Sequence, residues 1–346
     1  MKRSRSRREE ADDRCGVPRG FVLAAGILAS SLPFVTAGSL VAQGSSGSPV
    51  PATECCLPLL FTVGARALGL GDAVTARTSA GSLFANPATL ADVADDEFLV
   101  HNTRTSLEQS NTFTLLIRSE VAGTFALSYR LVDHGEQDAR DPNGNPTGRI
   151  GVFEQILTAS YATRVTAGIN AGISYKLYQF RQDCRGFCGI EGFSATTHGI
   201  DAGVQVRPPR IESLELGASI VHLGFPLQVI NAGQASPMPT RVRVGAAYEA
   251  AHHFSADTTV AAWLVLDVVA SPRDASQSLV NAGAEFSLDR TLFLWLGYAG
   301  GSGLTGGASV GVGLVYDRFD VGVSKSFLSS PIDDSEPLQV TFGIRF

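Results

Sequence analysis

Runs in which apolar and polar residues alternate one by one dominate this chain, and the last run is the clearest. Its apolar members are Leu338, Val340, Phe342, Ile344 and Phe346, and its polar members are Gln339, Thr341, Gly343 and Arg345. A period of two gives a strand one apolar and one polar face. A strand in a soluble sandwich is one source of this pattern. A strand of about 9–11 residues that ends on an aromatic residue favours the closing strand of an outer-membrane β-barrel.

Fourteen alternating runs follow Asp95. In one of them Ile200 and Val204 alternate with Asp201 and Gln205, and charged residues of this kind are tolerated in a wet lumen but costly in lipid. The sequence therefore predicts an all-β fold, a transmembrane antiparallel β-barrel of about 14 strands that occupies residues 95–346. The expected strands are 96–105, 109–119, 122–133, 151–164, 168–182, 194–207, 213–224, 240–250, 256–269, 277–287, 291–299, 305–316, 319–327 and 337–346.

The connections between these runs alternate in length. Short links are expected near 120–123, 165–167, 208–212, 251–255, 289–290 and 317–318. Longer ones are expected near 134–150, 183–193, 224–239, 270–277, 300–304 and 328–336. Short periplasmic turns and longer outer loops are typical of outer-membrane barrels, and an even strand number predicts that both termini are periplasmic. His252 and His253 fall in an expected short turn, where a solvated pair is favoured over a metal site.

The composition fits a barrel better than a helical membrane protein. Charged residues make up 17% of the chain, against about 25% in soluble domains, and mean hydropathy is only +0.12. The formal net charge of −6 argues against a nucleic-acid binder. Aromatic residues near the strand ends are expected to form interfacial girdles. These are Tyr129, Tyr161, Tyr175, Tyr248, Trp295, Tyr298 and Tyr316.

The N-terminus has the pattern of an export signal. A basic segment precedes an uncharged stretch from Phe21 to Gln43, and small residues offer cleavage sites after Ala37 or Ala42. We expect a signal peptide over residues 1–43 and a flexible linker over 44–60. An uncleaved anchor helix is the alternative, but Pro33 and Gly38 disfavour a continuous helix. No other segment approaches 18 apolar residues.

Cysteine usage agrees with export. Cys184 and Cys188 bracket a short Gly-containing segment, and an oxidising compartment favours a disulfide between them. The state of the adjacent Cys55 and Cys56 stays open. Because no histidine sits at ligand spacing beside these cysteines, neither a metal nor another cofactor is expected.

A glycine-rich stretch lies between the linker and the first strand, as 64-GARALGLGDAVTAR-77 followed by 79-SAGSLFANPATL-90. It lacks the strand–loop–helix context and the Lys-Ser/Thr pair of a phosphate loop. Gly64, Gly69 and Gly71 allow close backbone approach. Asn86-Pro87 favours a turn that starts a short helix. We therefore predict a hatch, residues 61–94, which packs inside the lumen.

This stretch resembles the N-terminal signature of the PorV/PorQ family of outer-membrane proteins, relatives of the FadL fatty-acid transporter barrels. The matching positions are Gly64, Arg66, Gly69, Gly71, Asn86 and Pro87. Residues 239–248 and the glycine-rich run 296–316 are also similar to late strands of the family, so the resemblance spans roughly 60–346. Two positions depart from the family pattern: Thr89 replaces a common glycine, and Asp72 replaces a small residue.

The resemblance implies a partner in type IX-like protein secretion, which binds secreted cargo at the outer membrane. The alternative is a FadL-like channel for hydrophobic small molecules, recognisable by an apolar tunnel and a lateral gap in the wall. The apolar loop 224–231 leans towards a binding surface. Outer-membrane lipid is an expected partner in both cases. So is the barrel-assembly machinery, which would read the terminal Phe346.

An enzyme is not expected, because no histidine stands in a recognisable nucleophile motif and no catalytic residue is predicted. Inward-facing carboxylates are expected to pair with arginines of the lumen rather than to act as acids or bases. These are Asp201, Glu249, Asp267 and Glu285.

Overall fold

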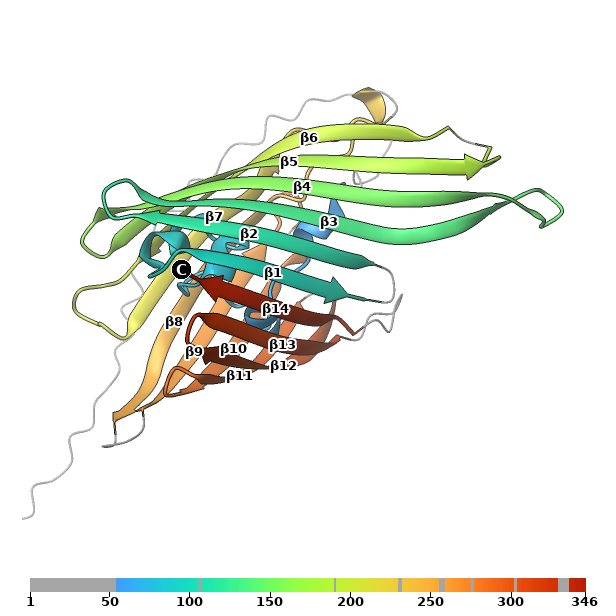
Figure 1. The fold of residues 1–346 in the computed structure, drawn as a ribbon. Helices are drawn as coiled ribbons and strands as arrows, with labels where there is room; N and C mark the ends of the chain where they lie inside the picture. The colour runs from blue at the N-terminus through green and yellow to red at the C-terminus, as the bar shows by residue number, and fades with distance from the viewer. Residues whose placement is uncertain are drawn as a thin grey trace, which may run out of the picture. The chain divides into compact units, whose positions relative to one another are not determined.

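The computed structural model describes residues 54–346 except 106–107, 190, 230–231, 255–258, 275–276, 302–303 and 329–335. The expected signal peptide lies outside these residues. Fourteen antiparallel strands close into one barrel in which each strand pairs with its sequence neighbours and β1 pairs with β14 (Figure 1). The predicted fold class is confirmed. The strands are β1 (Glu97–Arg104), β2 (Gln109–Ser119), β3 (Gly123–Arg140), β4 (Pro146–Thr166), β5 (Ile169–Gly186), β6 (Phe193–Val206), β7 (Leu214–Gly224), β8 (Arg241–Phe254), β9 (Thr259–Ala270), β10 (Leu279–Leu288), β11 (Leu292–Gly301), β12 (Leu304–Tyr316), β13 (Phe319–Leu328) and β14 (Leu338–Arg345).

The closing ladder runs from the pair Glu97–Arg345 to the pair Arg104–Leu338. We call the end of the barrel at which β1 begins and β14 ends the inner end, and the opposite end the outer end. The backbone N–H of Phe346 donates to the carbonyl of Asp96 (3.0 Å), so the last residue is fixed at the inner end. The longest connection, residues 225–240 between β7 and β8, lies at the outer end.

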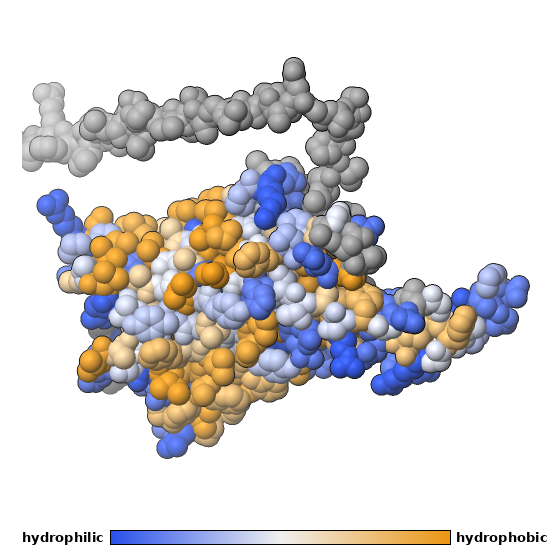
Figure 2. Space-filling view, turned by 90° about the horizontal axis from the view of Figure 1, so that it is seen from above, coloured by the Kyte–Doolittle hydropathy of each residue, from blue (hydrophilic) through white to orange (hydrophobic). Residues whose placement is uncertain are grey.

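The barrel has the polarity of a soluble protein turned inside out. On β14, Leu338, Val340 and Phe342 are exposed while Gln339 is buried. The same alternation repeats around the wall, and Figure 2 shows apolar side chains spread over much of its outer surface. Water would penalise such a surface, whereas hydrocarbon would not.

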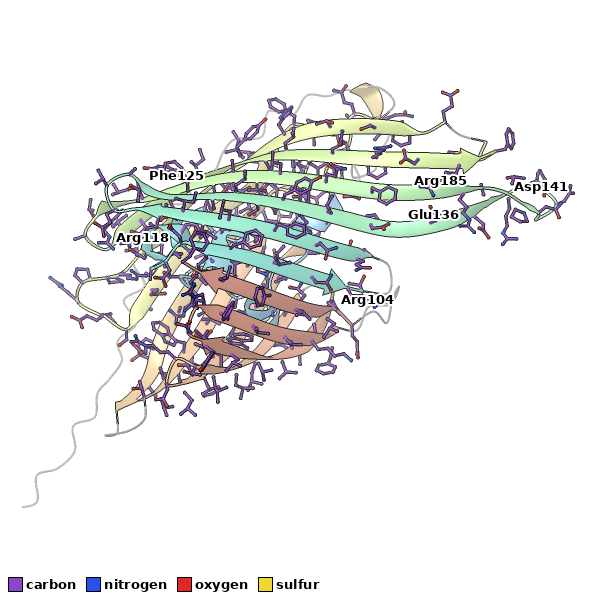
Figure 3. All side chains as sticks on the ribbon, in the orientation of Figure 1. Arg104, Arg118, Phe125, Glu136, Asp141 and Arg185 are labelled. Atoms are coloured by element: carbon purple, nitrogen blue, oxygen red, sulfur yellow. A yellow bond between two sulfur atoms is a disulfide. The ribbon has the colours of Figure 1, made fainter. Side chains whose placement is uncertain are left out.

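One side of the wall extends beyond the rest at the outer end. The sequence predicted a loop over 134–150, but β3 continues to Arg140, turns, and resumes as β4 at Pro146. Figure 3 shows Asp141 at the tip of this hairpin, well beyond Arg104 at the outer end of β1. Glu136 bridges Arg149 (3.3 Å) and Arg185 (3.1 Å) on the hairpin and β5. Both faces of the sheet are polar here, so the alternation of apolar and polar residues stops. The hydrogen bonding between β3 and β4 nevertheless continues.

Two further expectations differ from the structure. β8 runs to Phe254, so the backbone of His252 and His253 belongs to the strand and not to a turn; their side chains lie outside the described residues. Trp295 was expected at the membrane interface but is 4% exposed and faces the lumen. Its neighbours Leu294 and Leu296 point outward, and alternation along β11 requires the residue between them to point inward.

The lumen holds the chain that precedes β1. This chain forms the short helices η1 (Leu57–Leu60), α1 (Ala65–Gly69), η2 (Ala80–Phe84) and η3 (Pro87–Asp92); a further turn, η4 (Ala232–Gln234), belongs to the outer connection. In the segment 54–60, which the sequence analysis assigned to the linker, Cys56 and Pro58 are buried while Leu57 and Leu60 are exposed. Among the described residues no helix is long and apolar enough to cross a membrane.

Candidate functional site

Two hatch glycines touch the wall directly. A β-carbon on Gly69 would lie 2.8 Å from Cβ of Trp295 and 2.9 Å from Oγ of Ser324. Gly71 has φ +65°, and a β-carbon there would lie 2.7 Å from both the amide nitrogen and the carbonyl oxygen of Tyr298. Only glycine allows α1 and the following turn to approach the strands this closely.

The wall supplies glycines in return. A β-carbon on Gly172 would lie 2.5 Å from the backbone of Pro87, and one on Gly283 would lie 2.7 Å from the carbonyl of Leu70. One on Gly203 would collide with Oδ1 of Asn86. Part of the glycine content of the strands therefore makes room for the hatch, which the sequence pattern did not reveal.

Asn86 holds the centre of the hatch. Its Oδ1 accepts from the N–H of Ala88 (3.0 Å) and caps η3, which begins at Pro87. Its Nδ2 donates to the carbonyls of Thr75 (2.8 Å) and of Val204 in β6 (3.0 Å). A fully buried side chain thus joins two parts of the hatch to the wall.

Arg66 forms the strongest electrostatic link between α1 and the wall. Its Nε and Nη2 donate to Oε2 (2.5 Å) and Oε1 (2.9 Å) of Glu285, a bidentate geometry. Trp295 Nε1 donates to the same Oε2 (3.0 Å). Arg77 adds a second cation at 3.4 Å from Glu285, and its guanidinium lies 3.6 Å from the ring centroid of Trp263.

A second buried cluster joins the hatch to β8 and β9. Arg243 donates to Oδ2 of Asp72 (2.8 Å), to Oγ1 of Thr75 (2.9 Å) and to Oδ2 of Asp267 (3.1 Å). Thr75 in turn donates to Asp267 through its N–H and its hydroxyl. Asp72, which departs from the PorV/PorQ pattern, therefore pairs with Arg243 of the wall. Asp267 pairs with the same lumen arginine, as expected.

Asp92 anchors the inner end of the hatch. It accepts from Arg164, Asn170 and Arg207 at 2.5 Å each. Burial alone would raise the pKa of the Asp92 carboxyl. The hydrogen bonds from Arg164 and Asn170 and the charge of Arg207 outweigh burial, so the pKa lies below its usual value. The carboxylate is therefore charged at neutral pH.

Residues 54–62 lie at the outer end. The N–H of Cys55 donates to the carbonyl of Pro237 in the outer connection (2.9 Å). Arg241 binds both carboxylate oxygens of Glu54 (2.9 and 2.7 Å). The carbonyl of Pro58 accepts from Arg130 (2.7 Å). The described chain thus starts at the outer end and ends, with Phe346, at the inner end.

A pocket of about 740 Å³ opens above the hatch at the outer end of the lumen. Its floor comes from the start of the described chain, and its walls come from β1, β3–β5, β13, β14 and the connection 225–240. The apolar residues among its lining are Leu57, Pro58, Leu60, Phe61, Leu68, Phe180, Leu227, Val229 and Pro337, together with the Cys55–Cys56 pair. Sequence reasoning missed the pocket because residues far apart in the chain form it.

Two cavities lie on the other side of α1, towards the inner end. One measures about 340 Å³ and the other about 500 Å³, and Arg66 and Trp295 line both of them. Leu68, two residues after Arg66, lines the outer pocket instead. The single turn of α1 therefore separates the outer pocket from the inner cavities, and the Arg66–Glu285 pair holds it in place.

A buried ionic cluster also lies within the wall, between β5, β6 and β7. Lys176 Nζ lies 2.6 Å from Asp201 Oδ2 and 2.9 Å from His222 Nδ1, and all three side chains are buried. His222 sits at a register shift between β6 and β7 with φ +59°, and its N–H donates to Asp201 Oδ1 (2.8 Å). Asp201 thus pairs inward as expected, with a lysine instead of an arginine.

Disulfides join Cys184 to Cys188, at the outer extension, and Cys55 to Cys56, in the pocket. Over the described part of the chain, no three His, Cys, Asp or Glu side chains gather in a way that could hold a metal ion.

Comparison with known proteins identifies the fold. The chain aligns with the toluene transporter TodX of Pseudomonas putida at a TM-score of 0.53 and 13% identity, over 82% of this chain and 98% of TodX. It aligns with CymD, a monoaromatic hydrocarbon channel, at 0.52 and 13% identity, over 82% and 97% of the two chains. A FadL homologue of Pseudomonas aeruginosa aligns at 0.48 and 10% identity, over 86% and 99%. No protein-family model and no curated protein sequence matches the chain. The chain therefore has the fourteen-strand barrel fold of TodX and CymD.

Proposed function

We propose that this protein is an outer-membrane channel for small hydrophobic molecules, which enter through the outer pocket. The apolar outer surface of the wall suits a bilayer, and the expected signal peptide would deliver the chain to the periplasm. The inner end, with Phe346, then faces the periplasm. The sequence analysis favoured the secretion role, whereas the fold and the pocket favour the channel.

The observation that carries the proposal is the outer pocket itself. It is large enough for a small organic molecule, mostly apolar in its lining, and separated from the inner cavities by a single helical turn. A hydrophobic molecule gains by leaving water for this lining, and movement of α1 would connect it to the inner side. The fold shared with two hydrocarbon channels supports the same reading.

A role in protein secretion of the PorV/PorQ type is the second candidate. The motif from Gly64 to Pro87 supports it, and so does an exposed apolar residue in the outer connection: Phe225 is 72% exposed.

Every neighbouring pair of strands is hydrogen bonded, but β6 reaches beyond β7 at the outer end. There Phe225 donates its N–H to the carbonyl of His198 (3.0 Å).

Two substitutions in one loop separate the candidates. Leu227 is 5% exposed and lines the pocket, whereas Phe225 is exposed and does not line it. We expect Leu227→Asp to lower uptake of labelled toluene by a Gram-negative host that lacks hydrocarbon channels, and Phe225→Asp to leave it unchanged. Heat-modifiable gel mobility verifies that both variants fold. If Phe225→Asp impairs secretion of cargo in the native host while Leu227→Asp has no effect on uptake, the secretion role replaces the channel.

A further inference from the structure

The outer pocket contains a carboxylate oxygen that has no hydrogen-bond partner in the described part of the chain. Glu108 ends the turn between β1 and β2, is 6% exposed and lines the pocket. Its Oε1 is buried and accepts no hydrogen bond from the described residues. A buried carboxylate in this state is costly, so a donor that reaches it gains free energy.

The nearest cation is engaged elsewhere. Arg130 Nη2 lies 3.8 Å from Glu108 Oε1, longer than a hydrogen bond. Its Nη1 donates to the carbonyl of Pro58 (2.7 Å) and its Nη2 to Oγ of Ser110 (3.4 Å). These bonds hold the guanidinium against residues 54–60 and β2, so it balances part of the charge of Glu108 without satisfying its oxygen.

The other acids of the pocket already have partners. Glu154 lies 3.1 Å from His134 Nε2 and accepts the hydroxyl of Tyr178, while Glu54 is paired with Arg241. Among the described residues that line the pocket there is no lysine or arginine. The basic side chain of the lining, His134, is already paired with Glu154, so a ligand carboxylate would find no free cation in the described part of the lining and would meet the carboxyl group of Glu108 instead.

We propose that the pocket selects hydrophobic molecules that carry a neutral hydrogen-bond donor, such as phenols and alcohols, with Glu108 as the acceptor. Hydrophobic carboxylates are disfavoured by the same side chain. The inference rests on the proposed function and names the ligand class for that pocket. Glu108 sets specificity, while the apolar lining contributes affinity to every ligand of suitable size.

Three ligands of matched size test this class: ethylbenzene, 4-ethylphenol and 4-ethylbenzoate. Calorimetric titration of the detergent-solubilised full-length protein at pH 7 should give the highest affinity for 4-ethylphenol, a lower affinity for ethylbenzene and the lowest for 4-ethylbenzoate. In Glu108→Gln the phenol should lose about tenfold in affinity, because a hydrogen bond to a carboxylate is replaced by a weaker one to a neutral amide. Benzoate binding should rise, and ethylbenzene binding should stay the same.

The matched control is Glu136→Gln, because Glu136 lies on the outer extension and does not line the pocket. It should leave all three affinities unchanged. If ethylbenzene binds as tightly as the phenol, the ligand class is wrong while the channel stands. If the phenol is preferred but Glu108→Gln binds it equally well, Glu108 is not the acceptor. If none of the three binds, the channel and the inference both fall.

Discussion

Gly71 of the hatch lies directly against the backbone of Tyr298 in β11, where a β-carbon would come within 2.7 Å of the Tyr298 nitrogen and oxygen. The contact leaves no room for any other residue, and φ +65° at Gly71 disfavours one independently.

Replacement of this glycine should loosen the hatch and leave the barrel intact. Gly71→Leu should cost about 1–3 kcal/mol through overpacking, which falls on the hatch because the strand ladders do not depend on it. We expect greater sensitivity of cells to hydrophilic antibiotics with unchanged heat-modifiable mobility. Gly81→Ala is the control, since a β-carbon there meets nothing within 4 Å. Equal permeability in Gly71→Leu, Gly81→Ala and a strain without residues 61–94 would mean that the hatch is not a plug.

Loss of the carboxylate that holds α1 should expose the hatch to protease. Glu285→Gln leaves Arg66 and Arg77 without their shared anion, and breaking such a buried pair costs on the order of 3 kcal/mol. Trypsin should then cleave after Arg66 or Arg77 faster than in the wild-type protein. Asp138→Asn breaks an exposed pair with Arg140 and should have no effect. Cleavage of Glu285→Gln at the wild-type rate would show that the pairing of Arg66 and Arg77 with Glu285 does not hold the hatch in place.

The inner anchor should respond to acid. Because the pKa of Asp92 is depressed in the folded protein, its contribution is present above the unfolded pKa of about 4 and is lost as pH falls through the lower folded value. Conductance across planar bilayers should therefore be flat from neutral pH to about pH 5 and rise below about pH 4. Asp92→Asn should conduct at neutral pH as the wild-type protein does in acid. An acid response that survives in Asp92→Asn would assign it to another group.

The terminal residue should be required for assembly. Phe346 is exposed at the inner end, fixed by its N–H to Asp96, and the sequence predicts that the barrel-assembly machinery reads it. Deletion of Phe346, or Phe346→Asp, should reduce the heat-modifiable form and leave chain for periplasmic proteases. Arg118→Ala, an exposed change at the same end, should assemble normally. Assembly of both Phe346 variants at the wild-type level would argue against an outer-membrane barrel.

The Cys184–Cys188 bond should matter only locally. It closes a short loop at the exposed outer extension, so its reduction should cost at most a few kcal/mol and leave the barrel folded. Mass spectrometry after alkylation of unreduced, denatured protein tests the bond: neither cysteine should be labelled. Free alkylation at both positions would refute it.

The strands were predictable because each one crosses between two environments. Val242 and Val244 point outward while Arg241 and Arg243 point inward, and this contrast marks a strand wherever lipid lies on one side and the lumen on the other. Beyond Asp133 the contrast disappears because water lies on both faces, and the prediction ended the strand there while the hydrogen bonding of β3 with β4 continues.

The candidate site was only partly predictable. Gly69, Gly71 and Asn86 stood out because their residue types restrict the backbone or cap a helix, which depends on local sequence. The partners of these residues, and the place of Glu108 beside residues 54–60, depend on which strands face each other across the lumen. A period of two specifies which face of the sheet a side chain lies on. It does not specify which residue across the lumen that side chain contacts.

The described chain enters at the outer end near Pro237 and leaves the lumen at Glu97, beside the seam where β1 meets β14. This segment therefore passes through the lumen from the outer end to the inner end. Because β1 continues directly from this segment and forms half of the seam, the register of β1 against β14 also fixes where residues 54–94 enter the lumen. A slip in that seam would displace the hatch, so closure of the barrel and placement of its plug are coupled.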